Sequence, residues 1–300
     1  MNGTEFLQTL FAGFAQGTLY ALIAIGFVIV YKATGVLNFT TGGLLMAGAY
    51  LAHHAAVHWK LPFPAVVGVA ALGTGLLAVL VQRFVLQRLA GKPHFTLIMI
   101  TWAVLIVLEQ VPPSIWGYDV ITLGDPWGIA MTQVAGLSVF TIDLWAVAAA
   151  AMVVAGLYLF FRHSRLGLAM RATAIDREAA MAQGISPAAV FNAAWFLAGA
   201  VAGLAGVFLG GGARVVSPDL SWIALAAIPA VIVGGLDSPS GAVLGGVLVG
   251  IVEVLAANYV PLHAPWLGKN FHLVMPYLVL ITILVVRPYG LLGSRQVRRG

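Results

Sequence analysis

Hydrophobic stretches without any Asp, Glu, Lys or Arg alternate along the chain with short polar segments. The longest of them, residues 6–31 and 187–213, exceed the roughly 20 apolar residues that an α-helix needs to cross a 30 Å hydrocarbon layer. Shorter stretches need flanking polar residues that reach the interface, or helices that are partly broken. The pattern predicts about eight to ten transmembrane helices, placed near residues 6–31, 36–57, 61–82, 94–115, 143–161, 188–210, 220–235, 240–257 and 270–287.

The composition of the chain agrees with this pattern. Of the 300 residues, 61% are hydrophobic and 8% are charged, whereas a soluble domain carries about 25% charged residues. Most of the outer surface must therefore face lipid. We expect an all-α, polytopic membrane protein whose residues 1–300 form a single transmembrane domain. The sequence contains no cysteine, which excludes disulfides and thiolate metal sites.

The positions of the basic residues predict the orientation of the chain. With the N-terminus outside, 12 of the 15 Lys and Arg residues fall on the inner side, where positive charge accumulates. The inner set is Lys32, Arg83, Arg88, Lys92, Arg162, Arg165, Arg171, Arg177, Arg287, Arg295, Arg298 and Arg299; the outer set is Lys60, Arg214 and Lys269. This split predicts an N-out/C-in protein. The formal net charge of +5 lies in these loops, so we expect contact with lipid and no nucleic acid partner.

The largest polar segment, residues 162–187, lies on the predicted cytoplasmic side. Residues 171–183 lack Gly and Pro and are rich in Ala, which predicts one helix that Gly184 ends. Such a helix across the cytoplasmic face, with Asp176, Arg177 and Glu178 clustered on it, has the form of a docking site for a partner. The alternative is a solvated helix in a loop.

Two breaks interrupt otherwise apolar segments. The first contains Asn38, Thr40 and Thr41, and the second is residues 234–241, with Pro239. Irregular backbone at membrane depth persists only where protein or a water-filled cavity satisfies it. We therefore expect both breaks to line or gate a translocation path, with ordinary turns between short helices as the alternative.

Glycines recur on a helical stripe at Gly199, Gly203, Gly206 and Gly210, which favours close helix packing over contact with a solute. Two Gly-Gly segments, residues 42–48 and 245–250, also suggest an internal repeat.

The charged residues within the spans give little support for catalysis. Glu109 and Glu253 are expected in spans, where acidic groups usually face the interior of the bundle. Exposure to an external vestibule and a role in proton transfer are both open for them. There is no P-loop and no paired catalytic constellation, so we expect a transport protein without its own ATP site, catalytic residue or metal site. Energy must come from another subunit or from an ion gradient.

Collinear motifs over nearly the whole chain resemble the branched-chain amino acid permease family, specifically its LivH-type subunit. They are GTLYALIAIG at residues 17–26, LNFTTGG at 37–43, RATAIDREAA at 171–180, GGLDSPSGAVLGG at 234–246 and RPYGLLG at 287–293. Glu178, Ala179, Ala180 and Gly184 also match the start of the EAA loop of ABC-importer permeases. The chain departs from the family where Thr41 and Gly43 replace a frequent His and Glu, which points to a less charged pathway.

The resemblance implies a multi-pass permease subunit in the bacterial inner membrane. It implies a second homologous permease subunit, two ATPase subunits that bind ATP and Mg²⁺, and a periplasmic solute-binding protein. The ATPase-coupling residues would be Arg171, Asp176, Arg177, Glu178, Ala179, Ala180 and Gly184. The pathway or gating residues would be Asn38, Phe39, Thr40, Thr41, Gly42, Gly43, Gly234, Gly235, Ser238 and Pro239. The alternative function is an ion-coupled secondary carrier or channel without ATPase partners.

Overall fold

The computed structural model describes residues 3–89, 91–268 and 270–293, so Lys269, Arg295, Arg298 and Arg299 lie outside the described residues. The chain forms two compact units, each built from separate stretches of sequence. Unit 1 comprises the described parts of Met1–Val28, Ile129–Ala150 and Ala226–Gly300, and unit 2 comprises those of Ile29–Gly128 and Ala151–Leu225. The helices α1 (Gly3–Thr34) and α5 (Thr141–His163) each run from one unit into the other.

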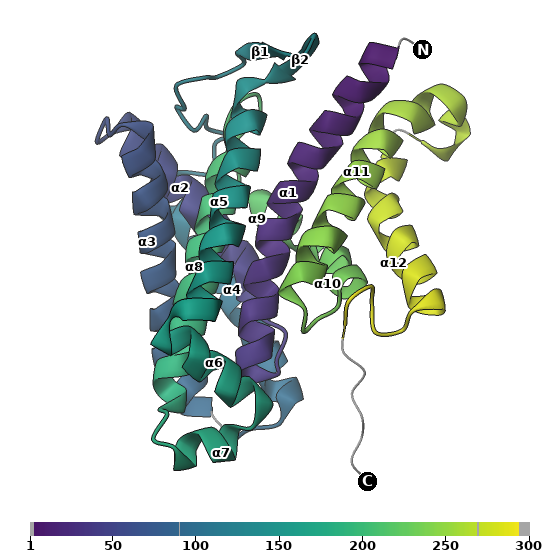
Figure 1. The fold of residues 1–300 in the computed structure, drawn as a ribbon. Coiled ribbons are helices and arrows are strands. Elements are labelled where there is room, and N and C mark those ends of the chain that lie inside the picture. The colour runs from purple at the N-terminus through teal and green to yellow at the C-terminus, as the bar shows by residue number, and fades with distance from the viewer. Residues whose placement is uncertain (1–2, 90, 269, 294–300) are drawn as a thin grey trace. The chain divides into compact units, whose positions relative to one another are not determined.

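Unit 2 is a bundle in which α2 packs against α3, α4 and α8 (Figure 1). Its elements are α2 (Thr40–Val57), α3 (Phe63–Val81) with a π turn (Gln82–Leu86) and a 3-10 turn (Gln87–Leu89), α4 (His94–Trp116), α6 (Arg165–Ile175), α7 (Arg177–Ala182), α8 (Pro187–Leu209) and α9 (Leu220–Ala226). The predicted glycine stripe lies between these helices. A Cβ on Gly199 would stand 2.6 Å from the Thr74 carbonyl oxygen, and one on Gly48 would stand 2.8 Å from that of Gly203. The packing role of these glycines is therefore confirmed.

Unit 1 contains the N-terminal part of α1 and the C-terminal helices. Its other elements are α10 (Ile228–Gly234), α11 (Pro239–His263), 3-10 turns at Pro265–Leu267 and Phe271–Val274, α12 (Met275–Val286) and a hairpin of β1 (Met131–Val134) and β2 (Leu137–Phe140). The hairpin pairs antiparallel, with Met131 opposite Phe140, and it lies where the sequence predicts a loop. A Cβ on Gly17 would stand 2.7 Å from the Val247 Cα, so the second Gly-Gly segment also serves helix packing.

Six helices are long and apolar enough to cross a membrane. They are Gly3–Thr34, Phe63–Leu89, His94–Trp116, Thr141–His163, Pro187–Leu209 and Pro239–His263, and shorter apolar helices occupy Leu220–Gly234 and Phe271–Val286. The predicted span at 220–235 is interrupted between α9 and α10, where Pro229 stands in the first turn of α10. Proline lacks the N–H that a continuous helix would need there.

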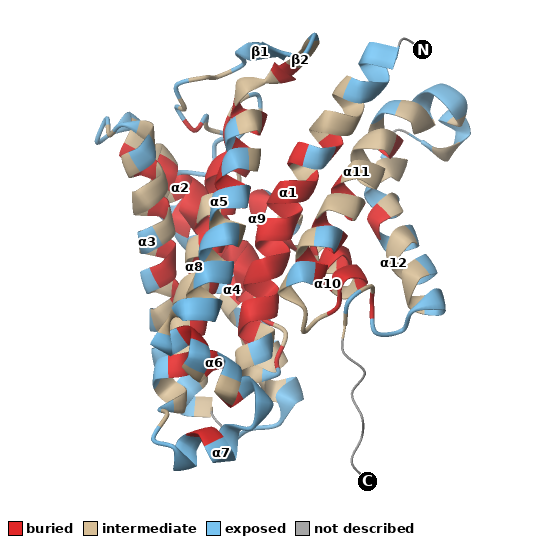
Figure 2. Cartoon of the chain, viewed as in Figure 1, coloured by how far each residue is buried: buried red, intermediate tan, exposed pale blue. Residues whose placement is uncertain are grey.

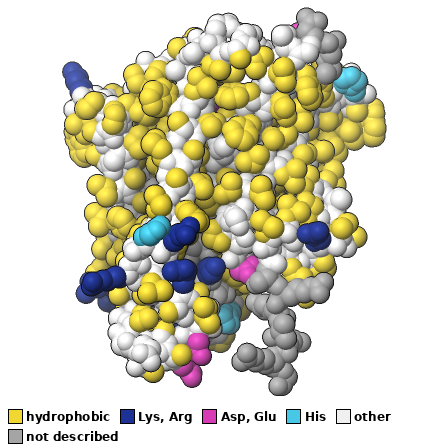
Figure 3. Space-filling view, viewed as in Figure 1, with side chains coloured by type: hydrophobic (Ala, Val, Ile, Leu, Met, Phe, Trp, Pro, Cys, Tyr) yellow, Lys and Arg dark blue, Asp and Glu magenta, His cyan; other side chains and the backbone are white. Residues whose placement is uncertain are grey.

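The exposed face of the helices is apolar, as a lipid-facing surface must be. On α3, Leu72, Leu76 and Leu80 are all at least half exposed and recur every four residues, which places them on one stripe. Hydrophobic side chains cover most of the face in Figure 3, whereas Lys and Arg gather around α6 and neighbouring helix ends. In contrast, residues 17–30 of α1 are all buried, whereas the first five residues of the helix are exposed (Figure 2). The buried part is hydrophobic on all sides, as expected of a helix in the core of a bundle.

Candidate functional site: a helix break beside a cavity

The break between α1 and α2 has its polar groups bound by the surrounding protein. Asn38 is buried, and its Oδ1 accepts hydrogen bonds from the Thr40 backbone N–H, at 3.1 Å, and from the Thr40 hydroxyl. The Thr41 hydroxyl donates to the Asn38 carbonyl oxygen at 3.1 Å. The Phe39 N–H donates to Thr101 Oγ1 on α4 at 3.3 Å. These bonds replace the helical hydrogen bonds that the break removes.

The position of Thr101 along α4 shows how deep this break lies between the helices. It is the eighth residue of α4, which begins at His94, so it lies about 10 Å along that helix. The irregular backbone is therefore well inside the length of a spanning helix. The sequence reasoning missed Thr101, whose only signal was a hydroxyl in an otherwise apolar span.

Gly42 and Gly43 allow α2 to approach its neighbours closely. A Cβ on Gly42 would stand 2.6 Å from the Ser221 carbonyl oxygen, and one on Gly43 would stand 2.5 Å from the Leu108 Cβ. The Ser221 hydroxyl donates to Glu109 Oε1 at 2.6 Å, so this predicted intramembrane acid has a partner within unit 2. A side chain at position 43 does not fit here unless Leu108 moves.

The segment 162–187 forms two helices, and the prediction of one helix over 171–183 is wrong. Asp176 is extended (φ −149°, ψ 109°) and caps α7: its Oδ1 accepts from the N–H groups of Glu178 and Ala179, both at 2.9 Å. Aspartate competes for backbone N–H groups and so favours the N-cap over a helix interior.

Gly184 ends α7 as predicted, with φ +81°. The N–H of Ile185 donates to the Ala180 oxygen at 3.1 Å, and that of Gly184 donates to the Met181 oxygen at 2.9 Å, which is a Schellman motif. Both ends of α7 are thus fixed by hydrogen bonds.

The exposed surface of α6 and α7 carries both charged and apolar side chains. Arg171, Asp176, Arg177, Glu178 and Ala179 are exposed, whereas Ala180 is buried. The apolar side chain of Ile175 is 88% exposed. A single exposed apolar side chain is common on protein surfaces, so the docking role of this segment rests on the fixed ends of α7 and on its sequence motif.

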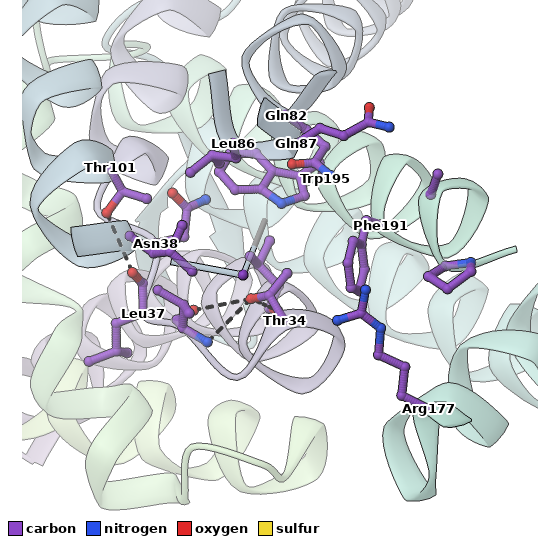
Figure 4. A pocket seen from close by; sticks show the side chains of 16 residues that line it. Thr34, Leu37, Asn38, Gln82, Leu86, Gln87, Thr101, Arg177, Phe191 and Trp195 are labelled. Atoms are coloured by element: carbon purple, nitrogen blue, oxygen red, sulfur yellow. Dashed lines mark hydrogen bonds between the residues drawn. The ribbon is translucent and has the colours of Figure 1, made fainter. Parts of the chain in front are cut away.

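A cavity of 420 Å³ lies within unit 2, lined by the end of α1, the connection between α1 and α2, the turns after α3, part of α4, the start of α7 and the first half of α8. Its polar lining residues are Thr34, Asn38, Gln82, Gln87, Thr101 and Arg177. Figure 4 shows the Arg177 guanidinium beside the Phe191 ring, with Asn38 and Trp195 lining the same cavity. The Arg177 Cζ lies 5.0 Å from the Phe191 ring centroid, a cation–π contact. The structure therefore brings a residue of each predicted site, Asn38 and Arg177, to one cavity.

The second predicted break lies in unit 1, where the C-terminal segment forms hydrogen bonds with the end of α10. Gly235 has φ +110°, and the N–H groups of Leu291 and Leu292 donate to the carbonyl oxygens of Val233, at 2.8 Å, and Gly234, at 3.0 Å. Two of the family motifs, distant in sequence, thus form one structure. Ser238 caps α11, whose first residue is Pro239, by accepting from the Gly241 N–H at 3.1 Å.

Other acidic and histidine residues do not line the cavity. On α11, the Glu253 carboxyl is hydrogen-bonded to the Tyr20 hydroxyl, and its Oε2 has no hydrogen-bond partner among the described residues. His53 Nδ1 lies 2.6 Å from the Thr122 carbonyl oxygen, and the Trp116 indole donates to His54 Nδ1 at 3.0 Å. Among the described residues, no group of three His, Asp or Glu side chains is placed to hold a metal ion.

Spanning helices, a broken helix at membrane depth and a capped helix pair outside the spans together define a membrane transport subunit. A family model described as branched-chain amino acid transport system / permease component matches residues 9–284, and the chain belongs to this family. The chain is 29% identical to the high-affinity branched-chain amino acid transport system permease protein LivH of Escherichia coli, over 98% of this chain and 97% of that protein.

A second relative supports this assignment, and a solved structure has a similar fold. The chain is 28% identical to the permease protein BraD of Pseudomonas aeruginosa over 98% of each protein. The structure titled PsaBC from Streptococcus pneumoniae in complex with Fab shares the fold, with a TM-score of 0.50 and 14% identity over 93% of this chain and 91% of that one. The resemblance and the polytopic helical fold are thus confirmed, and the chain is a multi-pass protein of the bacterial inner membrane.

Proposed function

We propose that the chain is the permease subunit of an ABC importer that translocates branched-chain or other amino acids, or a related small polar or carboxylated solute. Separate ATPase subunits would bind ATP and Mg²⁺ and drive alternating access. A second homologous permease subunit and a periplasmic solute-binding protein would complete the importer. The observation that carries the proposal is the exposed, doubly capped helix α7, which carries the EAA-like residues Glu178, Ala179 and Ala180.

The structure of the coupling segment supports a mechanical role. Hydrogen bonds at Asp176 and Gly184 fix the two ends of α7, and the buried Ala180 seats it on the bundle. A force on the exposed Glu178 would therefore move α7 as one body, and Arg171 would receive force on the neighbouring helix α6. Arg177 would pass this motion to Phe191 on α8 through their cation–π contact. In this proposal Asp176 and Arg177 transmit force and perform no chemistry.

The two breaks would line or gate the path. The first, with Asn38, Phe39, Thr40, Thr41, Gly42 and Gly43, is irregular at membrane depth and borders the cavity. The second, with Gly234, Gly235, Ser238 and Pro239, holds the C-terminal segment. Movement of either break would open or close a route between helices without unfolding them.

Charge reversal at Glu178 tests the docking role of α7. Because Glu178 is exposed and only its backbone N–H is bonded to Asp176, Glu178→Lys should keep the permease folded. We expect it to weaken co-purification of the ATPase subunits by about tenfold or more, the effect of disrupting a charged contact at an interface. Asp119→Lys reverses another exposed acidic residue, on the predicted outer side, and should leave the ATPase complex intact. Equal ATPase binding by Glu178→Lys and the wild type would contradict the docking role.

The second candidate function is an ion-coupled carrier, which the Glu253 oxygen without a partner favours. The two functions differ in what energises transport by purified protein in liposomes. The proposed importer should transport solute only with its ATPase subunits and ATP. Uptake by the permease chain alone, driven by a proton gradient and lost in Glu253→Gln, would establish the carrier instead.

A further inference from the structure

Hydrogen bonds hold α4 against α2 towards each end of their contact. At one end, the Phe39 N–H just before α2 donates to Thr101 Oγ1 on α4 at 3.3 Å. At the other end, the indole N–H of Trp116, the last residue of α4, donates to Nδ1 of His54 on α2 at 3.0 Å. The Trp116 ring also stacks on that of Tyr50, with centroids 6.0 Å apart. Among these groups, only the imidazole changes charge between about pH 5 and 8.

The bond from Trp116 fixes the protonation state of His54. An indole N–H is a donor only, so Nδ1 of His54 must present a lone pair, and the imidazole is neutral with its proton on Nε2. An imidazolium carries a proton on both ring nitrogens. His54 is partly exposed, and a proton that it takes from solvent at Nδ1 makes two N–H groups face each other. The hydrogen bond is therefore present while His54 is neutral and is lost as the pH falls.

The neighbouring histidine has the opposite arrangement. His53 Nδ1 lies 2.6 Å from the Thr122 carbonyl oxygen, which can only accept, so this nitrogen carries a proton in both charge states of the ring. Protonation of His53 keeps its bond and makes it charge-assisted. Backbone hydrogen bonds between Ile121 and Val216, at 3.0 and 2.8 Å, hold the same loop. Acid should thus release the end of α4 and leave the loop after it in place.

Few other groups that titrate lie on the helices around His54. The helices α3, α4 and α8 pack against α2, and neither α3 nor α8 contains a charged residue, a histidine or a tyrosine. On α4 the titratable residues are His94, at its far end, and Glu109, which accepts a hydrogen bond from Ser221. His58 stacks on His54 with centroids 4.7 Å apart, so two imidazolium rings there would repel each other. The connections near this end of α2 add Lys60, Tyr118, Asp119, Asp125 and Arg214.

We propose that His54 and Trp116 form a pH-sensitive latch between α2 and α4, which is closed at neutral pH and opened by protonation of His54. The bond between Phe39 and Thr101 contains no group that titrates near neutral pH, so it holds the other end of the contact. Acid then frees one end of α4, whose other end supports the break in the proposed path. The predicted N-out orientation places the latch on the periplasmic side. The inference goes beyond the proposed function, because it concerns the chain alone and holds whatever energises transport.

The indole N–H signal of Trp116 in a nuclear magnetic resonance spectrum reports the latch directly. The sample is the full chain in detergent with isotope-labelled tryptophan, and loss of the signal in Trp116→Phe assigns it. Between about pH 8 and 5 we expect the signal to move towards the position of an unbonded indole, along the titration curve of one proton. A signal that does not move in the wild type would overturn the proposal without the need for any variant.

Three histidine variants identify the group that titrates. His54→Gln keeps an acceptor oxygen but no group that takes up a proton near neutral pH, so its Trp116 signal should not change with pH. His53→Gln and His58→Gln are the matched controls, and both should keep the change seen in the wild type. A change that persists in His54→Gln, or that either control abolishes, would overturn the assignment to His54.

Hydrogen exchange measures what the latch does to α4. The Gly117 N–H donates to the Pro113 carbonyl oxygen at 2.8 Å and reports the end of this helix, whereas the Phe39 amide reports the other end of the contact. After correction for the direct effect of pH on exchange, acid should lower the protection of Gly117 about three- to tenfold, the loss expected for one hydrogen bond, and leave Phe39 protected.

Trp116→Phe keeps an aromatic ring against Tyr50 and removes the donor. At about pH 8 it should show the Gly117 protection that the wild type shows at about pH 5. Equal protection of Gly117 in the wild type at both pH values would show that the latch does not hold the helix end and would overturn the proposal. Loss of protection at Phe39 as well would indicate acid unfolding of the whole contact and would also contradict it.

Discussion

The break before α2 and the break before α11 look alike in sequence, because each is a glycine-containing motif ahead of an apolar helix. In unit 1, the C-terminal segment fills the second break, since Leu291 and Leu292 donate to the carbonyl oxygens at the end of α10. In unit 2, the first break leaves a buried donor of Asn38 without a partner beside a cavity. Two similar motifs therefore have different surroundings: the C-terminal segment closes one of them, and a cavity borders the other.

The largest expected effect on stability comes from adding a side chain at Gly235, in the break that the C-terminal segment closes. A Cβ on Gly235 would stand 2.6 Å from the Gly293 Cα, and its φ of +110° is unfavourable for any other residue. Gly235→Val should lower the free energy of unfolding by about 2–4 kcal/mol, from backbone strain and overpacking together. Thermal aggregation of the purified chain in detergent measures this loss. Gly68→Val, where a Cβ meets open space, is the control and should aggregate near the wild-type temperature.

A smaller effect is expected at the close approach of α2 to α4. Gly43→Ala places a Cβ 2.5 Å from that of Leu108, and overpacking of this kind costs about 1–3 kcal/mol. Leu108→Ala leaves space at the same contact. The double variant should therefore be more stable than the sum of the two single changes predicts. Strict additivity in thermal unfolding would show that these helices do not touch at this point.

The smallest effect concerns the hydrogen bond that supports the open break. Thr101→Val removes the hydroxyl that accepts from the Phe39 N–H and should cost about 1–3 kcal/mol, because it leaves a partly buried donor unpaired. Thr101→Ser keeps that hydroxyl and should be closer to the wild type. Hydrogen exchange of the Phe39 amide reports the change locally. Unaltered exchange in Thr101→Val would show that another group supports the break.

The sequence predicted the features that depend on local chemistry. Gly184 ends α7 because a positive φ at a helix end favours glycine, and six of the nine predicted spans are helices long and apolar enough to cross a membrane. The predicted span at 36–57 is not among them, and those at 220–235 and 270–287 are shorter apolar helices. The same reasoning failed at Asp176, where helix propensity over residues 171–183 was weighed above the capping ability of one aspartate. It also missed Gln82, Thr101 and Trp195, each a single polar group in an apolar helix with no local motif.

The sequence by itself therefore determined the class of protein, six of the nine predicted spans, the family and the exposed polar segment at 162–187, because these follow from periodicity, charge and short motifs. Only the tertiary structure decided which residues share a cavity. Asn38, Arg177 and Trp195 lie far apart along the chain, and helix packing brings them together. The fate of each polar group was likewise a tertiary matter. Whether a donor has a partner depends on its neighbours in space. The Phe39 N–H donates to Thr101 Oγ1, whereas Asn38 Nδ2 has no hydrogen-bond partner among the described residues.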